Sequence, residues 1–383
     1  MHQSLLSWRS EFPILEKSVY MISNSLGAMP RGARDELVAY ADAWAGRGVR
    51  AWSEGWWESA VETGNLLAPI LGAPKGSVAL HPNVSTALSI ILSCFEFGSP
   101  RDGIVTTDMN FPSVLYVLEQ QARRGARVVR VESEDGIGVD PRKLLDAIDE
   151  TTALVAVSHV LFRSAYIQDA GAVARKARSV GAKVILDVYQ SAGCVPVEVG
   201  RWGVDFAVGG CLKWLCGGPG TAFLYTRPDL APDLHPMMTG WQAHARPFDF
   251  DAGPMEWGDP RYRLLSGTPN VPAHYAARAG LKIIGEIGVA KIRERSLHLT
   301  GILLEEARAA GLHVTCPSDP AARGGTVALD VPGAEDVCRE LVARDILVDY
   351  RPRAGVRVSP HFYSTDEECR TVVRAAVEIL ARR

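Results

Sequence analysis

Lys213 is the side chain whose sequence setting points most directly to chemistry. It follows the apolar run DFAVGG at 205–210 and is flanked by Leu212 and Trp214. Burial among such neighbours disfavours the ammonium form, so the amine becomes a nucleophile toward an aldehyde. By itself this pattern is weak, because most lysines near strand ends simply reach solvent.

Asp187 ends another apolar run, AKVILDV at 182–188, and adds an acid to the lysine. Pyridoxal phosphate, an aldehyde cofactor that lysines hold, withdraws electrons well only while its ring nitrogen stays protonated. A buried carboxylate keeps it so. Taken alone, Asp187 is as well explained as a strand-end cap. The joint occurrence of Lys213 and Asp187 therefore predicts a pyridoxal phosphate site.

Three further segments supply candidate ligands for such a cofactor and its substrate. Ser85 and Thr86 lie in HPNVSTALSIILSCFE, typical of a turn and then a helix, whose N-terminus binds a phosphate or is merely capped. Phe111, in NFPS, is placed to cover the ring face, although loop phenylalanines more often join the core. Arg357, in GVRVSPHFY, offers a fork to a substrate carboxylate, with a surface arginine as the alternative.

The elements that must position these residues alternate between short β-branched runs and amphipathic stretches. This alternation predicts an α/β fold, a mainly parallel sheet with helices on both faces. In such sheets the ligand lies beyond the carboxyl ends of the strands, where Asp187, Lys213 and His159 fall. The expected strands cover residues 103–107, 126–132, 152–159, 182–188, 205–210 and 221–225.

The remainder of the chain predicts a second unit. Loops rich in Pro, Gly and Trp span about 226–272, and a long helix is expected from about Ala273. From about Gly311 the pattern is strand, strand, helix, strand, helix, which indicates a smaller α/β domain. We therefore expect three parts: an N-terminal segment packing on the small domain and the active site (1–50), a large cofactor-binding domain (51–272), and a linking helix with the small C-terminal domain (273–383).

Composition excludes several classes of function. Hydrophobic residues make up 47% and charged residues 22% of the 383 residues, with no apolar run long enough to span a membrane. A net charge of −3 with mixed signs gives no support for a nucleic-acid partner. The seven cysteines form no CxxC pair, so free thiols are expected rather than metal ligands. With no secretion signal at the start, we expect a cytoplasmic enzyme without a metal.

Segments spread along most of the chain resemble kynureninase, a member of the class V aminotransferase group of pyridoxal-phosphate enzymes (fold type I). They occur in the order found in that family, which makes the resemblance more specific than any single motif. They are ISNSLGAMP (22–30), GVRAWSEGWW (48–57), NFPS (110–113), SHVLFRSAYIQD (158–169), DVYQSAG (187–193), GGCLKWLCGGPGTAFLY (209–225), GW (240–241), LSGTP (265–269) and VRVSPHFY (356–363).

The resemblance implies a role for each matching residue. Lys213 holds the cofactor covalently, Asp187 pairs with the ring nitrogen, and Gln190 donates to the ring phenolate oxygen. In the same way, the resemblance implies that Ser85 and Thr86 bind the phosphate, that Phe111 stacks on the ring, and that Trp241 and Thr268 contact the phosphate of the neighbouring subunit's cofactor. For the substrate, it implies that Arg357 binds the carboxylate and that Ser25 and Trp52 lie near the side chain. His159 is grouped with the cofactor-binding residues, while Arg163 and Tyr166 have no assigned role. Shared sites of this kind imply a homodimer.

The chain departs from the kynureninase pattern at three positions. Leu212 stands where kynureninases usually have Tyr, Val114 where they have Asp, and Gln190 where they have His. Glutamine donates a hydrogen bond but cannot shuttle a proton as imidazole does. Cysteine desulfurases, a rival class V group, carry a nucleophilic Cys shortly before the arginine motif. Here that stretch is LVDYRPRAGVR, without cysteine.

The leading hypothesis is a kynureninase-like hydrolase acting on a small amino acid, L-kynurenine or a related substrate. The mechanism that the resemblance implies has Lys213 as the base at Cα, water adding to the γ-carbonyl, and cleavage of Cβ–Cγ to release an acyl product and alanine. The alternatives are another class V reaction (β-elimination, epimerisation or transamination) and a non-catalytic paralogue that only binds the cofactor. A nicotinamide dehydrogenase is disfavoured because GxGxxG after a first strand is absent.

Overall fold

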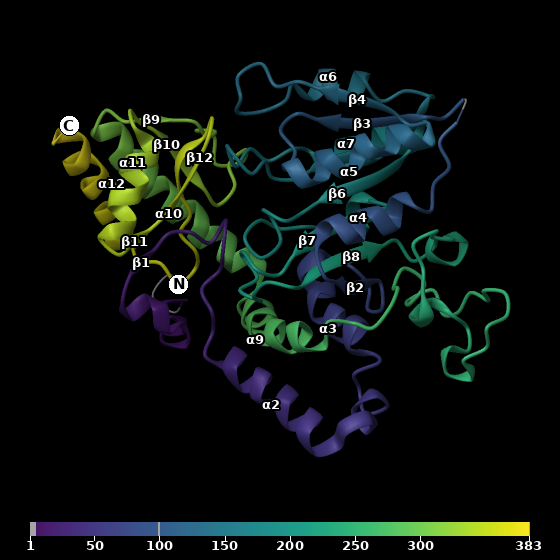
Figure 1. Ribbon diagram of the computed structural model, residues 1–383. Coiled ribbons are helices and arrows are strands. Elements are labelled where there is room, and N and C mark those ends of the chain that lie inside the picture. Colours follow the sequence, from purple (N-terminus) through teal and green to yellow (C-terminus); the bar gives the residue numbers. More distant parts are fainter. Residues whose placement is uncertain (1–4, 99, 383) are drawn as a thin grey trace.

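The computed structural model describes residues 5–98 and 100–382 and is built around a seven-stranded sheet, whose strands can be followed in Figure 1. The strand order is β2-β8-β7-β6-β5-β3-β4, and β8 runs antiparallel to both of its neighbours. All six predicted strands are confirmed, and β2 was not predicted. The strands are β2 (Val78–His81), β3 (Gly103–Thr107), β4 (Arg127–Val131), β5 (Thr152–Ser158), β6 (Lys183–Asp187), β7 (Phe206–Gly210) and β8 (Ala222–Thr226).

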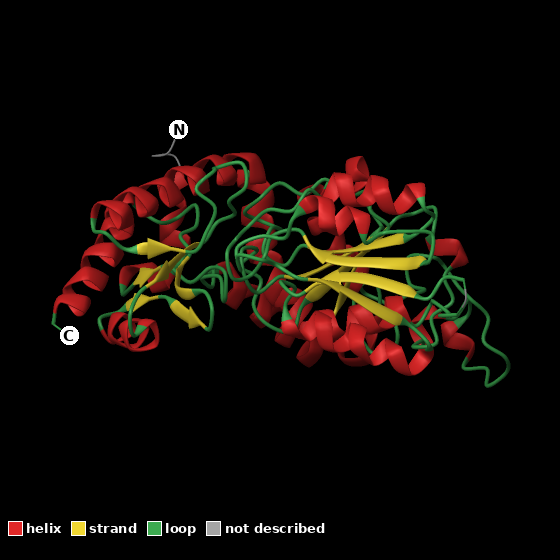
Figure 2. Ribbon diagram, turned by 90° about the horizontal axis from the view of Figure 1, so that it is seen from above, coloured by secondary structure: helices red, strands yellow, loops and turns green. Residues whose placement is uncertain are grey.

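Helices cover both faces of this sheet, as predicted (Figure 2). Alternate side chains of β5 show why: Val155 and Val157 join the core on one face, and Leu154 and Ala156 join the core on the other. Strands buried on both faces favour unbroken apolar runs, which is what the sequence has there. The first face packs on α3 (Ser59–Leu67), α7 (Ala170–Ser179) and α9 (Val271–Ile287); the second packs on α4 (Val84–Leu92) and α5 (Pro112–Gln120). Two shorter helices, α6 (Pro141–Asp146) and α8 (Val199–Trp202), complete this part.

The predicted long helix from about Ala273 is two helices. α9 ends at Ile287, and α10 (Val289–Ala309) begins after Gly288. Gly288 has φ of +83°, a left-handed conformation that a regular helix cannot contain and that glycine adopts at little cost. The periodic apolar pattern continues through this break, so the sequence pattern alone indicated one element.

A second sheet follows α10, with four antiparallel strands in the order β12-β13-β10-β9. The predicted tail had one strand before the last helix, which is wrong because three short strands lie there. These strands pack with the helices around a separate apolar core that includes Leu303, Val356 and Val372. The elements are β9 (His313–Val314), β10 (Val327–Asp330), α11 (Ala334–Ala343), β11 (Ile346–Leu347), β12 (Asp349–Arg351), β13 (Gly355–Val358) and α12 (Asp366–Ala381).

The N-terminal segment contacts elements that lie beside each of the two sheets. β1 (Val19–Tyr20) pairs in parallel with β11, and α2 (Gly32–Arg47) packs against α9, as Figure 1 shows. We keep the division at 1–50, 51–272 and 273–383 as a proposal. Its second boundary falls inside α9, whose buried Leu281 and Ile284 belong to the core of the large sheet.

The last helix has a capping box that lends itself to a stability test. Thr365 Oγ1 accepts from the Glu368 backbone N–H at 3.1 Å, and Glu368 Oε2 accepts from the Thr365 N–H at 2.6 Å. We expect Thr365→Ala to lower the free energy of unfolding by about 1 kcal/mol, because the cap is lost, and to leave catalysis unchanged. Urea unfolding followed by circular dichroism measures this. An unchanged transition midpoint would contradict the role of the cap.

Two further observations concern the state of the cysteines and the presence of helices that could span a membrane. All seven cysteines are free thiols. In the described part of the chain, no helix is both long and apolar enough to cross a membrane.

Candidate active site

A cavity of about 350 Å³ lies at the carboxyl ends of β5, β6 and β7. Parallel strands bring their carboxyl ends to one edge, so residues far apart in sequence meet there. Seven of the predicted site residues line this cavity: Ser25, Ser85, Phe111, Asp187, Gln190, Lys213 and Arg357. Their convergence makes this cavity the candidate active site.

The Lys213 amine lies near two aromatic rings that also line the cavity. Its Nζ is 4.2 Å from the ring centroid of Tyr189 and 5.6 Å from that of Phe111. Burial lowers the pKa of Lys213 to about 8, although the nearby Asp187 carboxylate opposes that shift. The amine is therefore available as a neutral nucleophile near neutral pH, which an exposed lysine is not.

This pKa gives a testable pH dependence. Only the neutral amine attacks an aldehyde, so the rate at which cofactor-free protein captures pyridoxal phosphate should rise with pH and level off above about 8, the pKa of Lys213. Stopped-flow absorbance measures the capture rate, with N-acetyl-lysine as the free-amine control. A rate that kept rising toward pH 10 would show that the Lys213 amine behaves like an ordinary lysine.

Asp187 is buried at the end of β6. Its Oδ1 accepts from the Tyr189 backbone N–H at 2.9 Å, and its Oδ2 accepts from Ser158 Oγ at 3.4 Å. Burial raises the pKa of Asp187, while these hydrogen bonds and the Lys213 charge oppose the rise. A cationic ring nitrogen placed here would pair with this carboxylate and offset its desolvation.

The start of α4 forms the candidate anion site. Asn83 Oδ1 accepts from both the backbone N–H and the hydroxyl of Thr86, at 2.9 and 3.1 Å. The plain N-cap is thus present, made by Asn83 rather than by Ser85 or Thr86. Ser85 lines the cavity with its hydroxyl not engaged in this cap, whereas Thr86 does not line it. The helix N-terminus still faces the same edge of the sheet, where it favours an anion.

Gln190 is held at both ends of its amide. Its Nε2 donates to Asn24 O at 3.0 Å, and its Oε1 accepts from Trp214 Nε1 at 3.0 Å. These bonds fix the orientation of the amide and leave its second N–H for another acceptor. Donation from this N–H to the cofactor ring, expected where kynureninases have His, stays a prediction.

Arg357 is buried, so the alternative of a surface arginine is wrong. Its side chain is 3% exposed, and its Nε and Nη2 donate to the two oxygens of Asp349 at 2.8 and 2.5 Å. Nη1 donates to Phe162 O at 2.6 Å. The fork predicted for a substrate carboxylate is therefore engaged by Asp349, although Arg357 is among the residues that line the cavity.

His159 is not brought into the cavity. Successive side chains of a strand point to opposite faces, so Ser158 lines the cavity while His159 turns away. The His159 ring packs edge-on against Trp202 at 5.0 Å, and burial lowers its pKa to about 4. Its grouping with the cofactor-binding residues is not supported by this geometry. Arg163 and Tyr166 also lie outside the cavity lining.

Trp52, Trp241 and Thr268 likewise lie away from the cavity of their own chain. Trp52 packs against Trp56 at 5.6 Å, Trp241 packs against Trp57 at 4.7 Å, and Thr268 is exposed. The roles that the resemblance gives Trp241 and Thr268, at the neighbouring subunit's site, stay predictions.

Several cavity residues were missed from the sequence. Asn24, Tyr189 and Arg351 line the cavity beside predicted residues. Asn24 precedes Ser25, Tyr189 stands between Asp187 and Gln190, and Arg351 lies in the stretch searched only for cysteine. Their position next to motif residues was the available signal.

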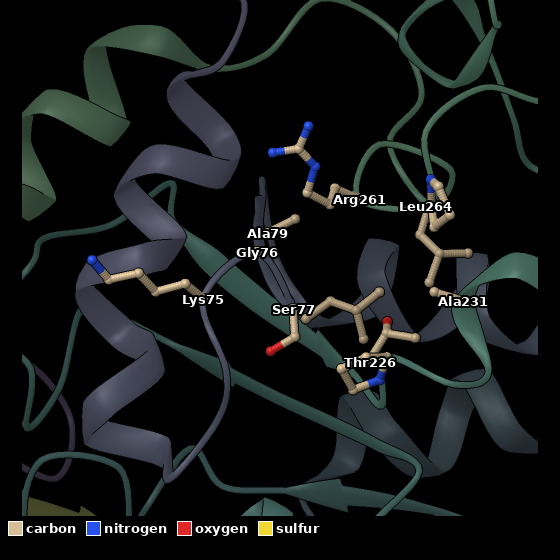
Figure 3. Close-up of a pocket in the computed structure, with 11 residues that line it drawn as sticks. Lys75, Gly76, Ser77, Ala79, Thr226, Ala231, Arg261 and Leu264 are labelled. Carbon is tan, nitrogen blue, oxygen red and sulfur yellow. The ribbon is translucent and has the colours of Figure 1, made fainter.

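A different cavity, of about 170 Å³, lies by β2 and β8 (Figure 3). Lys75 and Arg261 are its basic residues, and Figure 3 shows their charged ends well separated rather than meeting at one point. Arg261 is paired with Asp259 at 2.5 Å. Without converging polar groups, this cavity is a weaker candidate than the one at Lys213.

Comparison with known proteins points in the same direction. The family model for aminotransferase class-V matches residues 19–380, nearly the whole chain. The chain belongs to the class V aminotransferase family. A kynureninase from Pseudomonas fluorescens is 33% identical to this class V enzyme over 403 residues, covering 99% of the chain and 93% of the relative.

Two solved structures have the same fold as this class V enzyme. The apo cysteine desulfurase from Thermococcus onnurineus NA1 aligns with a TM-score of 0.87 at 24% identity, covering 98% of each chain. A mutant of C-DES with glycine covalently linked to its PLP cofactor aligns with a TM-score of 0.87 at 20% identity, covering 97% of this chain and 99% of that one. At these identities the two structures establish the fold alone.

Membership of the family makes this chain a kynureninase-like enzyme that depends on pyridoxal 5′-phosphate. The residues present fit that cofactor. A buried amine of lowered pKa, a buried carboxylate and a helix N-terminus lie around one cavity of about 350 Å³. The amine can react with the aldehyde of the cofactor, the carboxylate can pair with its ring nitrogen, and the helix N-terminus can bind its phosphate.

Proposed function

We propose that this class V enzyme hydrolyses L-kynurenine, or a closely related amino acid, between Cβ and Cγ to give anthranilate and alanine. The observation that carries the proposal is the placement of Lys213 and Asp187 in the wall of one cavity, in a chain that aligns over 99% of its length with a kynureninase. Pyridoxal phosphate, when bound, supplies a ring that withdraws electrons from the substrate.

Each residue then has a defined task. Lys213 holds the cofactor and, once its amine is free, removes the proton from the substrate Cα. Asp187 keeps a proton on the ring nitrogen, and Gln190 donates its second N–H toward the ring oxygen. Ser85 and the start of α4 bind the phosphate, and Phe111 covers the ring face.

The substrate contacts the cavity residues that come from the small sheet and the N-terminal segment. Arg357 draws the α-carboxylate with the N–H groups that Asp349 and Phe162 leave free, and Ser25 lies toward the substrate side chain. The pairing with Asp349 holds the guanidinium in place, which limits the entropy lost when a carboxylate binds.

We propose further that the active enzyme is a homodimer in which Trp241 and Thr268 complete the partner's site. Support comes from their place outside their own cavity, combined with the resemblance. The free thiols support the cytoplasm as the compartment.

Mixed dimers test this sharing. Lys213→Ala and Trp241→Ala should each be inactive alone. Refolded together in equal amounts, they should recover about a quarter of wild-type activity, because half the dimers are mixed and one of the two sites in each is intact. Activity measured after mixing, with each variant refolded alone as control, decides the point. No recovery would place Trp241 in the site of its own chain.

The second candidate is another class V reaction, favoured by the cavity wall itself. Leu212 and Val114 line the cavity where kynureninases have Tyr and Asp, so two polar groups are replaced by apolar ones. Cysteine desulfuration is not favoured. Among the described residues that line the cavity there is no cysteine, and burial raises the pKa of nearby Cys211 to about 12.

The products released from a panel of amino acids distinguish these functions. Purified cofactor-loaded protein should convert L-kynurenine to anthranilate and alanine and leave the other amino acids unchanged. Pyruvate with ammonia would indicate β-elimination, a D-amino acid epimerisation, and a 2-oxo acid transamination. Any of these without anthranilate would replace the proposed function by the second candidate.

A further inference from the structure

Asn24 stands out in the wall of the cavity because its side-chain amide has no partner among the described residues. The residue is 1% exposed, and neither its Oδ1 nor its Nδ2 makes a hydrogen bond within that part of the chain. Most buried polar side-chain atoms in proteins are hydrogen-bonded, because leaving them unpaired costs free energy. A buried amide that lacks both a donor and an acceptor at the edge of a cavity therefore indicates a ligand.

The backbone around Asn24 is held from several sides of the cavity. Asn24 O accepts from Gln190 Nε2 at 3.0 Å, and the Gly27 N–H donates to Leu212 O at 2.8 Å. A Cβ on Gly27 would lie 2.1 Å from Lys213 O, so the segment sits directly against the lysine loop. We therefore do not expect a movement of the Asn24 segment to bring its side-chain amide a hydrogen-bond partner.

The missing partners define the chemical class of the ligand. Nδ2 needs an acceptor, and Oδ1 needs a donor. An α-amino acid carries both on one carbon, a carboxylate and a nitrogen that bears hydrogen. Arg351 and Arg357 line the same cavity and favour an anion there. The arginines attract the anion. The uncharged Asn24 amide also orients the ligand, because it distinguishes the carboxylate from the nitrogen on the α-carbon.

We propose that Asn24 is a substrate-binding residue whose Nδ2 donates to the α-carboxylate and whose Oδ1 accepts from the nitrogen on the same carbon. This inference rests on the proposed function only in taking an amino acid as substrate, and it does not depend on which bond is cleaved.

Binding of L-alanine and L-kynurenine to the cofactor-loaded enzyme tests the proposal, followed through the visible absorbance of the bound cofactor. Asn24→Leu and Asn24→Asp should weaken binding about tenfold to a hundredfold, since each removes a hydrogen bond to a charged group. Cofactor content and the spectrum without amino acid should stay as in the wild type. Asn24→Asp should be the weaker binder, because its charge repels the carboxylate.

Thermal stability separates this role from a structural one. Asn65 is the matched control: its Oδ1 accepts from the Gly76 N–H at 2.7 Å, so Asn65→Leu should lower the melting temperature and leave amino-acid binding unchanged. Asn24→Leu should not lower the melting temperature of the cofactor-loaded enzyme without amino acid, because the amide that it removes makes no hydrogen bond within the described part of the chain.

Three results would overturn the proposal. They are unchanged amino-acid binding in both Asn24 variants, a fall in melting temperature for Asn24→Leu as large as for Asn65→Leu, and loss of the cofactor itself. A wild-type enzyme that responds to neither amino acid would overturn the proposed substrate class together with this inference. Binding of L-kynurenine without cleavage would overturn only the proposed reaction, and the Asn24 variants would still be informative.

Discussion

Lys213→Ala should abolish turnover of any amino acid. Loss of proton transfer at Cα alone is worth about 10²–10⁴-fold, and the variant also loses the amine that holds the cofactor. The amine is the buried group near Tyr189 and Phe111, and no other lysine lines the cavity among the described residues. Purified variant and wild type, loaded with pyridoxal phosphate, are compared by product release and by the visible spectrum.

Lys183→Ala is the matched control for this experiment. Lys183 begins β6, at the opposite end of the strand from Asp187, and lies 3.6 Å from Asp205. Its removal should leave turnover and spectrum unchanged. Full turnover by Lys213→Ala would contradict the catalytic role of Lys213. If the wild type itself had the spectrum but no turnover of any amino acid, the non-catalytic interpretation would gain the support that it now lacks.

Asp187→Asn should lower kcat by about 10²–10³-fold, the typical cost of removing one preorganised electrostatic group. The substitution keeps the size of the side chain and an oxygen to accept from the Tyr189 N–H, so the fold should be retained. It removes the charge that keeps the ring nitrogen protonated. Substrate affinity should change much less than kcat, because Asp187 serves the cofactor rather than the substrate.

Steady-state kinetics with the melting temperature and cofactor content check this expectation. Asp187→Glu keeps the charge and should recover part of the lost rate, although its longer side chain fits the strand end less well. A kcat of Asp187→Asn equal to that of the wild type would show that the ring nitrogen needs no anionic partner here.

The fold and the centre of the site were predictable because both depend on local pattern. Asp187 and Lys213 each follow an apolar strand, and a parallel sheet necessarily gathers such strand ends at one edge. The break between α9 and α10 at Gly288 was not predictable, because the apolar periodicity continues through it and only the glycine marks the change. The three short strands before α12 were hidden for a similar reason, because strands of two to four residues are too short to show a period.

The misses in the site have a different cause. Asn24 and Arg351 come from the N-terminal segment and the small sheet, and only the tertiary arrangement brings them to the Lys213 cavity. His159 shows the converse case: its place at the carboxyl end of a predicted strand suggested a site residue, but neighbouring side chains of a strand face opposite ways, and Ser158 rather than His159 lines the cavity. The engagement of Arg357 by Asp349, eight residues earlier, follows from the pairing of β12 with β13.

The central claim is hydrolytic cleavage of an amino acid at the Lys213 site, and oxygen-18 water tests it most directly. Wild-type enzyme given pyridoxal phosphate and L-kynurenine in this solvent should release anthranilate and alanine in equal amounts, with one oxygen-18 atom in the anthranilate carboxylate, and Lys213→Ala should release neither. Mass spectrometry detects both products. No anthranilate from a wild-type enzyme whose spectrum shows bound cofactor would contradict kynurenine hydrolysis and direct attention to the other class V reactions.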